Sequence, residues 1–119
     1  MKRILHIDDE ADIREILAGC LTHHGYEVVS VATPTEAFQA IQRAKPDLVI
    51  CDLQLDESDG LQTIDRLRVT LPEVPVILLT GVLLPPHLAH ETMQKRRLVY
   101  LEKTVPLQRI LDEIKLLLA

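Results

Sequence analysis

Short apolar runs alternate with longer amphipathic segments along the chain, and this alternation restricts the fold more than any other feature of the sequence. The apolar runs are residues 4–7, 28–31, 48–51, 76–79 and 98–101. The first, third and fourth runs are almost continuously apolar, which is typical of parallel strands covered on both faces. Helical periodicity fills the intervals. We therefore expect an α/β domain with a parallel sheet and right-handed crossovers.

The helical segments differ in how continuous their apolar faces are. In the first segment, apolar residues at helical spacing are Ile13, Ile16, Leu17, Cys20 and Leu21. The last segment carries an apolar stripe from Leu107 to Leu118, whereas the segment that opens at Pro85-Pro86 has only a thin apolar face. Because packing of an apolar face supplies most helical stability, we expect the fourth helix to be the least stable.

Polar and small residues mark the helix ends. Residues 33–36 combine an N-cap threonine, a first-turn proline and a capping-box glutamate. Ser58 or Asp59 can cap the third helix, and Gly25 is a stop signal for the first. These signals predict five helices between and after the strands.

The composition excludes several classes of function. The chain has 119 residues, a net charge of −5 and 3% aromatic residues. This length suits one domain, to which we assign residues 1–119. The negative charge and the few aromatic residues argue against direct binding to nucleic acid or to anionic membranes. No apolar stretch is long enough for a signal peptide or a membrane span, so we expect a cytoplasmic protein. Cys20 and Cys51 are expected to be buried free thiols.

Polar side chains follow four of the five predicted strands. They are Asp8-Asp9-Glu10, Asp52, Thr80 and Glu102-Lys103. In an open α/β sheet, ligands bind beyond the carboxyl ends of the strands, near the point where the strand order reverses. We therefore expect these groups, far apart in the chain, to meet at one edge of the sheet.

The residue types at this edge suit phosphoryl transfer. Carboxylates that lie close together repel one another, and Mg²⁺, which prefers oxygen ligands, is the natural counter-charge for Asp8, Asp9 and Asp52. Lys103 offers a compact positive charge to a phosphoryl oxygen, and the Thr80 hydroxyl can donate to another. Phosphoryl transfer depends mostly on positioning and charge neutralisation, and a carboxylate can serve as the acceptor.

In these residues the sequence resembles the response-regulator receiver domains of two-component signalling, over essentially the whole chain. The matching residues are Asp8-Asp9, Asp52, Asp59-Gly60, Thr80, Lys103 and, three residues before that lysine, Tyr100. The resemblance implies a doubly wound, flavodoxin-like fold. Its five-stranded parallel sheet has the strand order 2-1-3-4-5 and is surrounded by five helices.

The resemblance also implies a role for each residue. Asp52 is the phosphoacceptor, and the Mg²⁺ ligands are Asp8, Asp9, Asp52 and the backbone carbonyl of Gln54. The residues that contact the phosphoryl group are Thr80 and Lys103, and the switch residues are Thr80 and Tyr100. The residues that can tune hydrolysis are Gln54, Asp56 and Val82.

The implied partners are those of a phosphorelay. The donor would be a phosphohistidine on a sensor histidine kinase or a phosphotransfer protein. The protein would assist only its own phosphorylation and dephosphorylation, so it is not expected to be an enzyme in any other sense. Output would pass through the face made by the fourth helix, fifth strand and fifth helix, to an effector protein or a homodimer. The chain can also be a fragment of a longer regulator.

Four departures from the family pattern lie near this output face or the site. Thr104 follows Lys103 where the family has proline after a cis bond, and a cis bond before a non-proline residue costs about 2.5–4 kcal/mol. Asp56 replaces a common proline, Arg96-Arg97 replace a small Gly-Ala pair, and Pro85-Pro86 alter the loop after the fourth strand. Output is therefore expected to differ from the family more than the phosphorylation chemistry does.

Two other functions remain open. One is a docking module of the same fold that works without phosphorylation. The other is a Mg²⁺-dependent phosphatase acting through an aspartyl phosphate, although Gln54 stands where that class has a second acid.

Plainer interpretations also apply to single residues. The first acids can cap a helix, Thr80 can shape a turn, and Tyr100 can simply pack on an edge strand. His6 is expected to be a core residue with hydrogen-bonded ring nitrogens. The run 95–97 is either a solvated face or a docking patch.

Overall fold

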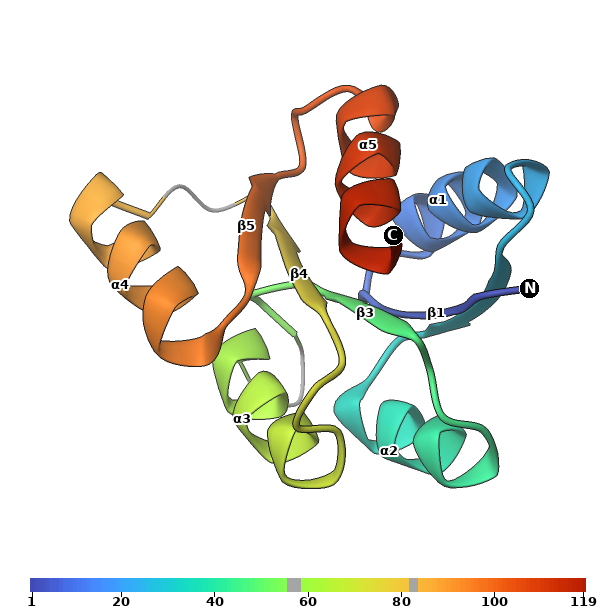
Figure 1. Ribbon diagram of the computed structural model, residues 1–119, viewed down its shortest axis with the longest axis horizontal. Helices are drawn as coiled ribbons and strands as arrows, with labels where there is room; N and C mark the ends of the chain where they lie inside the picture. The colour runs from blue at the N-terminus through green and yellow to red at the C-terminus, as the bar shows by residue number, and fades with distance from the viewer. Residues whose placement is uncertain (56–58, 82–83) are drawn as a thin grey trace.

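Strands and helices alternate along the protein in a computed structural model that describes residues 1–55, 59–81 and 84–119 (Figure 1). The strands are β1 (Arg3–Ile7), β2 (Glu27–Val31), β3 (Leu48–Cys51), β4 (Val76–Thr80) and β5 (Val99–Glu102). The helices are α1 (Ala11–His23), α2 (Pro34–Arg43), α3 (Gly60–Thr70), α4 (Pro86–Arg96) and α5 (Leu107–Leu118). Three residues named above, Asp56, Ser58 and Val82, lie outside the described residues.

The strands of the described chain form one five-stranded sheet in the order β2-β1-β3-β4-β5, and every pairing is parallel. The predicted fold class is therefore confirmed. From β1 the chain moves outward to β2 and then crosses back to β3, so the strand order reverses between β1 and β3. The carboxyl ends of these two strands border the crevice where such sheets bind ligands.

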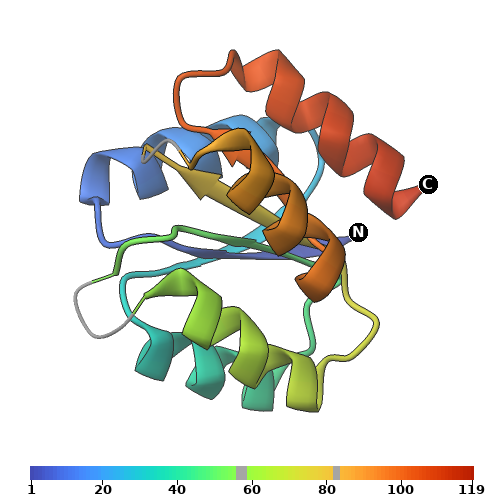
Figure 2. The same ribbon diagram turned by 90° about the vertical axis from the view of Figure 1, so that its left-hand side faces the viewer.

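The helices cover the sheet on both faces, with α1 and α5 on one face and α2 and α3 on the other (Figure 2). Alternate side chains of β1 serve the two layers: Ile4 packs in the cluster under α1 and α5, while Leu5 and Ile7 pack in the opposite cluster. Because both faces are covered, β3 and β4 are buried at every position. This burial explains the continuous apolar runs in their sequences.

The predicted end signals operate in the structure. Thr33 Oγ1 accepts a hydrogen bond from the amide of Glu36, and the Glu36 carboxylate accepts one from the amide of Ala32. Asp59 caps α3 by accepting from the amide of Gln62 at 2.8 Å. Gly25 follows α1 with a φ of 90°, which favours glycine.

Two apolar residues predicted to face inward are exposed. Ile16 is 57% exposed and Leu107 is 42% exposed. The sheet covers only a narrow stripe of α1 around Leu17 and Leu21, and periodicity alone does not show how wide the covered stripe is.

The prediction for His6 was wrong in one respect. The residue is fully buried, but within the described chain neither ring nitrogen has a hydrogen-bond partner. Its Nε2 lies 3.8 Å from Oδ2 of Asp8. Burial, together with the charges of Lys103 and Arg14, lowers the pKa of His6 to about 4, so the ring is neutral at pH 7.

Cys20 and Cys51 are free thiols as predicted, but only Cys51 is fully buried, whereas Cys20 is half-buried. The bond between Lys103 and Thr104 is trans. Within the described ranges, no helix is long and apolar enough to cross a membrane.

Candidate functional site

The strand ends bring the predicted polar residues to one edge of the sheet. Asp8 directly follows β1, Asp52 follows β3, Thr80 closes β4, and Lys103 follows β5. Backbone hydrogen bonds extend the strand pairing to these residues: the amide of Asp52 donates to the carbonyl of Ile7 at 3.0 Å, and the amide of Lys103 donates to that of Thr80 at 2.8 Å. The strand pairing therefore fixes the backbone positions of these residues.

Four carboxylates form a cluster at this edge. Each of Asp8, Asp9, Glu10 and Asp52 offers an oxygen, and these oxygens lie within 4.8 Å of one another. Asp8 and Asp52 are buried, Asp9 is half-buried, and Glu10 is exposed. So many negative charges in a small volume require cations nearby.

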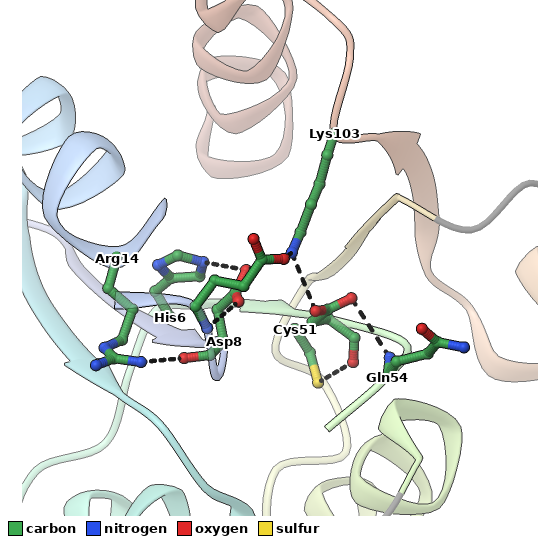
Figure 3. A network of polar contacts seen from close by, with 8 residues as sticks. His6, Asp8, Arg14, Cys51, Gln54 and Lys103 are labelled. Carbon is green, nitrogen blue, oxygen red and sulfur yellow. Dashed lines mark hydrogen bonds and ion pairs between the residues drawn. The ribbon is translucent and has the colours of Figure 1, made fainter. Parts of the chain in front are cut away.

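Lys103 supplies one cation (Figure 3). Its Nζ lies 3.0 Å from Oδ2 of Asp52, 3.0 Å from Oδ2 of Asp8 and 2.7 Å from Oε1 of Glu10. Burial acts to lower the pKa of Lys103, but the contacts with Glu10, Asp8 and Asp52 outweigh it and raise that pKa above its ordinary value. The ammonium is therefore charged at pH 7.

The carboxylate of Asp8 is held on two sides. Its Oδ1 accepts a hydrogen bond from the amide of Glu10 at 2.9 Å, and its Oδ2 faces Lys103. Arg14, from the first turns of α1, donates to the backbone carbonyl of Asp8 at 2.7 Å. Burial raises the pKa of Asp8, while the Glu10 amide and Lys103 oppose that shift. A second cation at this site would stabilise the ionised form further.

The surroundings of Asp52 leave little free space on its backbone side. Oδ1 accepts a hydrogen bond from the amide of Gln54 at 3.4 Å, and Oδ2 accepts from Lys103. A Cβ at Gly60 would lie 1.9 Å from the carbonyl oxygen of Asp52, so only glycine allows α3 to approach this closely. Cys51 donates from its thiol to the same carbonyl, and its pKa is raised by burial and by the charge of Asp52.

The two predicted switch residues lie on the neighbouring strands β4 and β5. Thr80 is fully buried at the end of β4. Tyr100 is half-buried on β5, and its hydroxyl accepts a hydrogen bond from the amide of Leu84 at 3.3 Å. Tyr100 is thus linked to the segment that leads into α4.

The donor set fits a magnesium ion. Carboxylate oxygens are the ligands that Mg²⁺ prefers, and the ion is usually held by one or two of them. The cluster in the described chain has four carboxylates against the single ammonium of Lys103, which leaves a negative excess. Oδ2 of Asp8 is buried and has an ion-pair contact but no hydrogen bond, so it retains a free lone pair.

Sequence reasoning missed three contributors to this site. Glu10 was noted only as part of an acidic run, yet it makes the shortest contact with Lys103. Gly60 appears in the sequence only as part of the matching Asp59-Gly60 pair, and no role is predicted for Arg14. The acidic run was a usable signal for Glu10, but the other two roles depend on how α1 and α3 lie against the sheet.

Comparisons with known proteins agree with this fold. The family model of the response regulator receiver domain matches residues 4–115. The chain is 39% identical over 78 residues to the transcriptional regulatory protein GlrR of Escherichia coli K12, covering 66% of this chain and 18% of that protein. It is 42% identical over 81 residues to the probable transcriptional regulator ycf27 of Porphyridium aerugineum, covering 68% and 33%.

A solved structure covers the chain more completely. The response regulator protein TrrA of Thermotoga maritima, in complex with Mg²⁺ and BeF, superposes with a TM-score of 0.84 at 30% identity, covering 98% of this chain and 99% of that one.

The fold and the site thus define a class of protein: a doubly wound α/β domain with an acidic cluster and a lysine at its strand ends. The chain belongs to the response regulator receiver domain family of two-component systems. It spans only about a fifth to a third of the length of the two regulators named above.

Proposed function

We propose that this domain is a phosphoacceptor switch in which Asp52 receives a phosphoryl group from a phosphohistidine. The observation that carries the proposal is the position of Lys103, whose Nζ lies 3.0 Å from a carboxylate oxygen of both Asp52 and Asp8. A lysine so placed neutralises charge at the acceptor and remains in reach of an added phosphoryl oxygen.

The chemical step is a displacement at phosphorus. A carboxylate oxygen of Asp52 attacks the phosphorus, a P–O bond forms, and the P–N bond to the donor imidazole breaks. The imidazole leaves with a proton, and Asp52 becomes an aspartyl phosphate. Hydrolysis reverses the modification: water attacks the phosphorus, the P–O bond to Asp52 breaks, and inorganic phosphate leaves.

In this proposal Asp8, Asp9 and Asp52 hold Mg²⁺, with the backbone carbonyl of Gln54 as a further ligand. The ion would neutralise the charge that develops on the phosphoryl oxygens. The residues of the chain do the rest: Lys103 pairs with one phosphoryl oxygen, and the Thr80 hydroxyl donates to another.

We also propose how the modification is transmitted. Thr80 moves toward the phosphoryl group, and Tyr100 turns inward toward the space that Thr80 leaves. This movement would break the hydrogen bond to Leu84 and alter the face made by α4, β5 and α5. A cytoplasmic sensor histidine kinase or phosphotransfer protein would be the donor, and an effector protein or a second copy of the chain would receive the signal.

Labelling with a small phosphodonor tests the proposal. We expect the chain, incubated with Mg²⁺ and acetyl phosphate, to gain the mass of one phosphoryl group, and Asp52→Asn to gain none. Asp12→Asn, an exposed acid on α1, is the matched control and should label as the wild type does. Equal labelling of Asp52→Asn would refute the assignment. No labelling of the wild type would favour the phosphorylation-independent docking module, and steady turnover of a phosphate ester would favour the phosphatase.

A further inference from the structure

Glu10 makes a contact that the proposed chemistry does not require. It is the N-cap residue of α1, yet its side chain does not cap the helix. The carboxylate instead turns toward the sheet and accepts a hydrogen bond from Lys103 Nζ at 2.7 Å. This contact is shorter than the two that Lys103 makes with Asp8 and Asp52. We propose that Glu10 is a positioning residue that occupies the place of a phosphoryl oxygen on Lys103 until Asp52 is phosphorylated.

The Lys103 ammonium has a limited number of hydrogen-bond donors, and carboxylates already surround it. An ammonium group has three N–H donors. Among the described residues, three carboxylates surround this one, those of Asp8, Glu10 and Asp52. Two of these contacts, those with Glu10 and Asp52, are hydrogen bonds, and Asp8 adds an ion pair at 3.0 Å. Because the Lys103 side chain is only 13% exposed, a further acceptor has to share the ammonium with these three carboxylates. A phosphoryl oxygen on Asp52 therefore competes with the existing acceptors.

Burial identifies Glu10 as the group that withdraws. The side chains of Asp8 and Asp52 are 1% and 6% exposed, whereas that of Glu10 is 59% exposed. A buried carboxylate that loses its partner is left without water, but an exposed one is hydrated at once. Asp8 and Asp52 also remain engaged with the metal in the proposed function. Glu10 is the one partner that Lys103 can release at small cost.

Charge strengthens the competition. The incoming phosphoryl group is an anion, and it enters a cluster in which four carboxylates face one ammonium. Glu10 both holds Lys103 and repels the new anion. The contact therefore stabilises the unphosphorylated state relative to the phosphorylated state. This inference rests on the proposed function, since it concerns the same lysine and the same phosphoryl site.

Binding of a phosphoryl mimic tests the inference without measuring any reaction. The full chain, saturated with Mg²⁺, is titrated with beryllium fluoride and followed by amide NMR signals. We expect Glu10→Ala to bind the mimic about two- to fivefold more tightly than the wild type, the range that an exposed ion pair supports. Glu15→Ala removes an exposed glutamate from the same helix and should bind as the wild type does.

Glu10→Asp separates contact from charge. Aspartate keeps the negative charge, but its carboxylate is one methylene short of Lys103. If Glu10 acts by holding the lysine, Glu10→Asp should bind the mimic more tightly, as Glu10→Ala does. Wild-type behaviour of Glu10→Asp would overturn the inference, because the effect would then come from the electrostatic field alone.

A direct titration with Mg²⁺ distinguishes a positioning role of Glu10 from a role as a metal ligand. If Glu10 were a ligand, Glu10→Ala would weaken Mg²⁺ binding more than about tenfold, and that result would overturn the inference. We expect a change smaller than threefold (roughly 0.6 kcal/mol). A wild-type chain that binds no mimic would refute the proposed function and this inference with it. Normal binding by the wild type with no gain in Glu10→Ala would refute this inference alone.

Discussion

Gly60 shows how one residue type can determine both stability and the shape of the site. The first residue of α3 lies so near the carbonyl of Asp52 that a methyl group there would overlap it. We expect Gly60→Ala to lower the free energy of unfolding by about 2–4 kcal/mol, because α3 must move away. Phosphodonor labelling of Asp52 should slow in the same variant. Urea unfolding and mass spectrometry measure the two effects.

Gly19→Ala is the matched control for this substitution. Gly19 lies inside α1, and a Cβ there would meet no atom within 4 Å. Alanine in a helix interior is more favourable than glycine, so the variant should gain about 0.5–1 kcal/mol. If Gly60→Ala were as stable as Gly19→Ala, the close approach of α3 to Asp52 would be wrong.

Burial of His6 should make the stability of the protein depend on pH. Its pKa is about 4 in the folded protein against 6.5 in the unfolded chain. The unfolded state therefore binds the proton more readily, and stability present above pH 6.5 is lost as the pH falls toward 4. We expect the contribution of His6 to lower the free energy of unfolding by about 2 kcal/mol as the pH falls from roughly 7.5 to roughly 5.

The comparison with His6→Val isolates this effect. Asp8, whose pKa is raised by burial, contributes a slope of the opposite sign in both proteins. The difference between the urea unfolding free energies of wild type and variant should therefore change with pH by the His6 contribution alone. An identical pH profile for the two proteins would show that the pKa of His6 is the same in the folded and unfolded states, which contradicts its burial without a hydrogen-bond partner in the described part of the chain.

Residue identities predicted the members of the site better than they predicted its contacts. The acids and the lysine follow strands with continuous apolar runs, so a parallel sheet brings Asp8, Asp52 and Lys103 to one edge. The contact of Glu10 with Lys103 and the approach of Gly60 to Asp52 depend on the exact seating of helices. Local sequence patterns do not encode that seating. For the same reason, periodicity placed Ile16 on the wrong side of the boundary between buried and exposed.

At the scale of elements, three arginines tie α4 to the rest of the fold. Arg96 makes two hydrogen bonds to the carboxylate of Asp65 on α3, at 3.0 and 3.3 Å. Arg68 of α3 donates to the carbonyl of Arg97 at 3.0 Å, and Arg97 donates to that of Pro72. These contacts supplement a helix whose buried positions, among the described residues, reduce to Thr92.

Removing the Arg96 contact should loosen α4 selectively. We expect Arg96→Ala to speed amide hydrogen exchange in α4 by about two- to fivefold and to leave β1 and β3 unchanged, as an exposed ion pair is worth only about 0.2–1 kcal/mol. Lys95→Ala removes an exposed cation from the neighbouring position and serves as the control. Equal acceleration in both variants would mean that the loss of charge, not the link to Asp65, loosens the helix.

The departure at Arg96-Arg97 could be seen in the sequence, but its structural meaning could not. In place of the family's small Gly-Ala pair, the two arginines have long side chains that reach α3 and the loop after it. Arg97 adopts a left-handed backbone conformation with a φ of 54°. Which carbonyls these arginines reach depends on the spacing between two helices packed on the same sheet. The continuous runs of β3 and β4, by contrast, were predicted almost to the residue because full burial leaves a purely local signature.

At the scale of the whole molecule, we expect the acidic cluster to couple folding to metal binding. The unfolded chain does not hold four carboxylates together, so an ion that binds the folded state stabilises it by mass action. We expect the melting temperature to rise with Mg²⁺, with about 1.4 kcal/mol gained per tenfold excess over the dissociation constant. Differential scanning calorimetry measures the rise.

Asp9→Asn provides the control for the metal effect. Asp9 is half-buried, so the substitution should leave the fold intact while it removes one of the proposed ligands. The melting temperature of this variant should rise much less with Mg²⁺ than that of the wild type. A rise as large as in the wild type would indicate that the ion binds elsewhere.

The amide of Lys103 and the carbonyl of Thr80 share a backbone hydrogen bond at the end of the sheet. The two residues proposed to contact the phosphoryl group are therefore linked through their backbones. A displacement of the Thr80 peptide would be carried to the Lys103 peptide through this hydrogen bond, so the proposed contacts with the phosphoryl group and the proposed movement of Thr80 would change together.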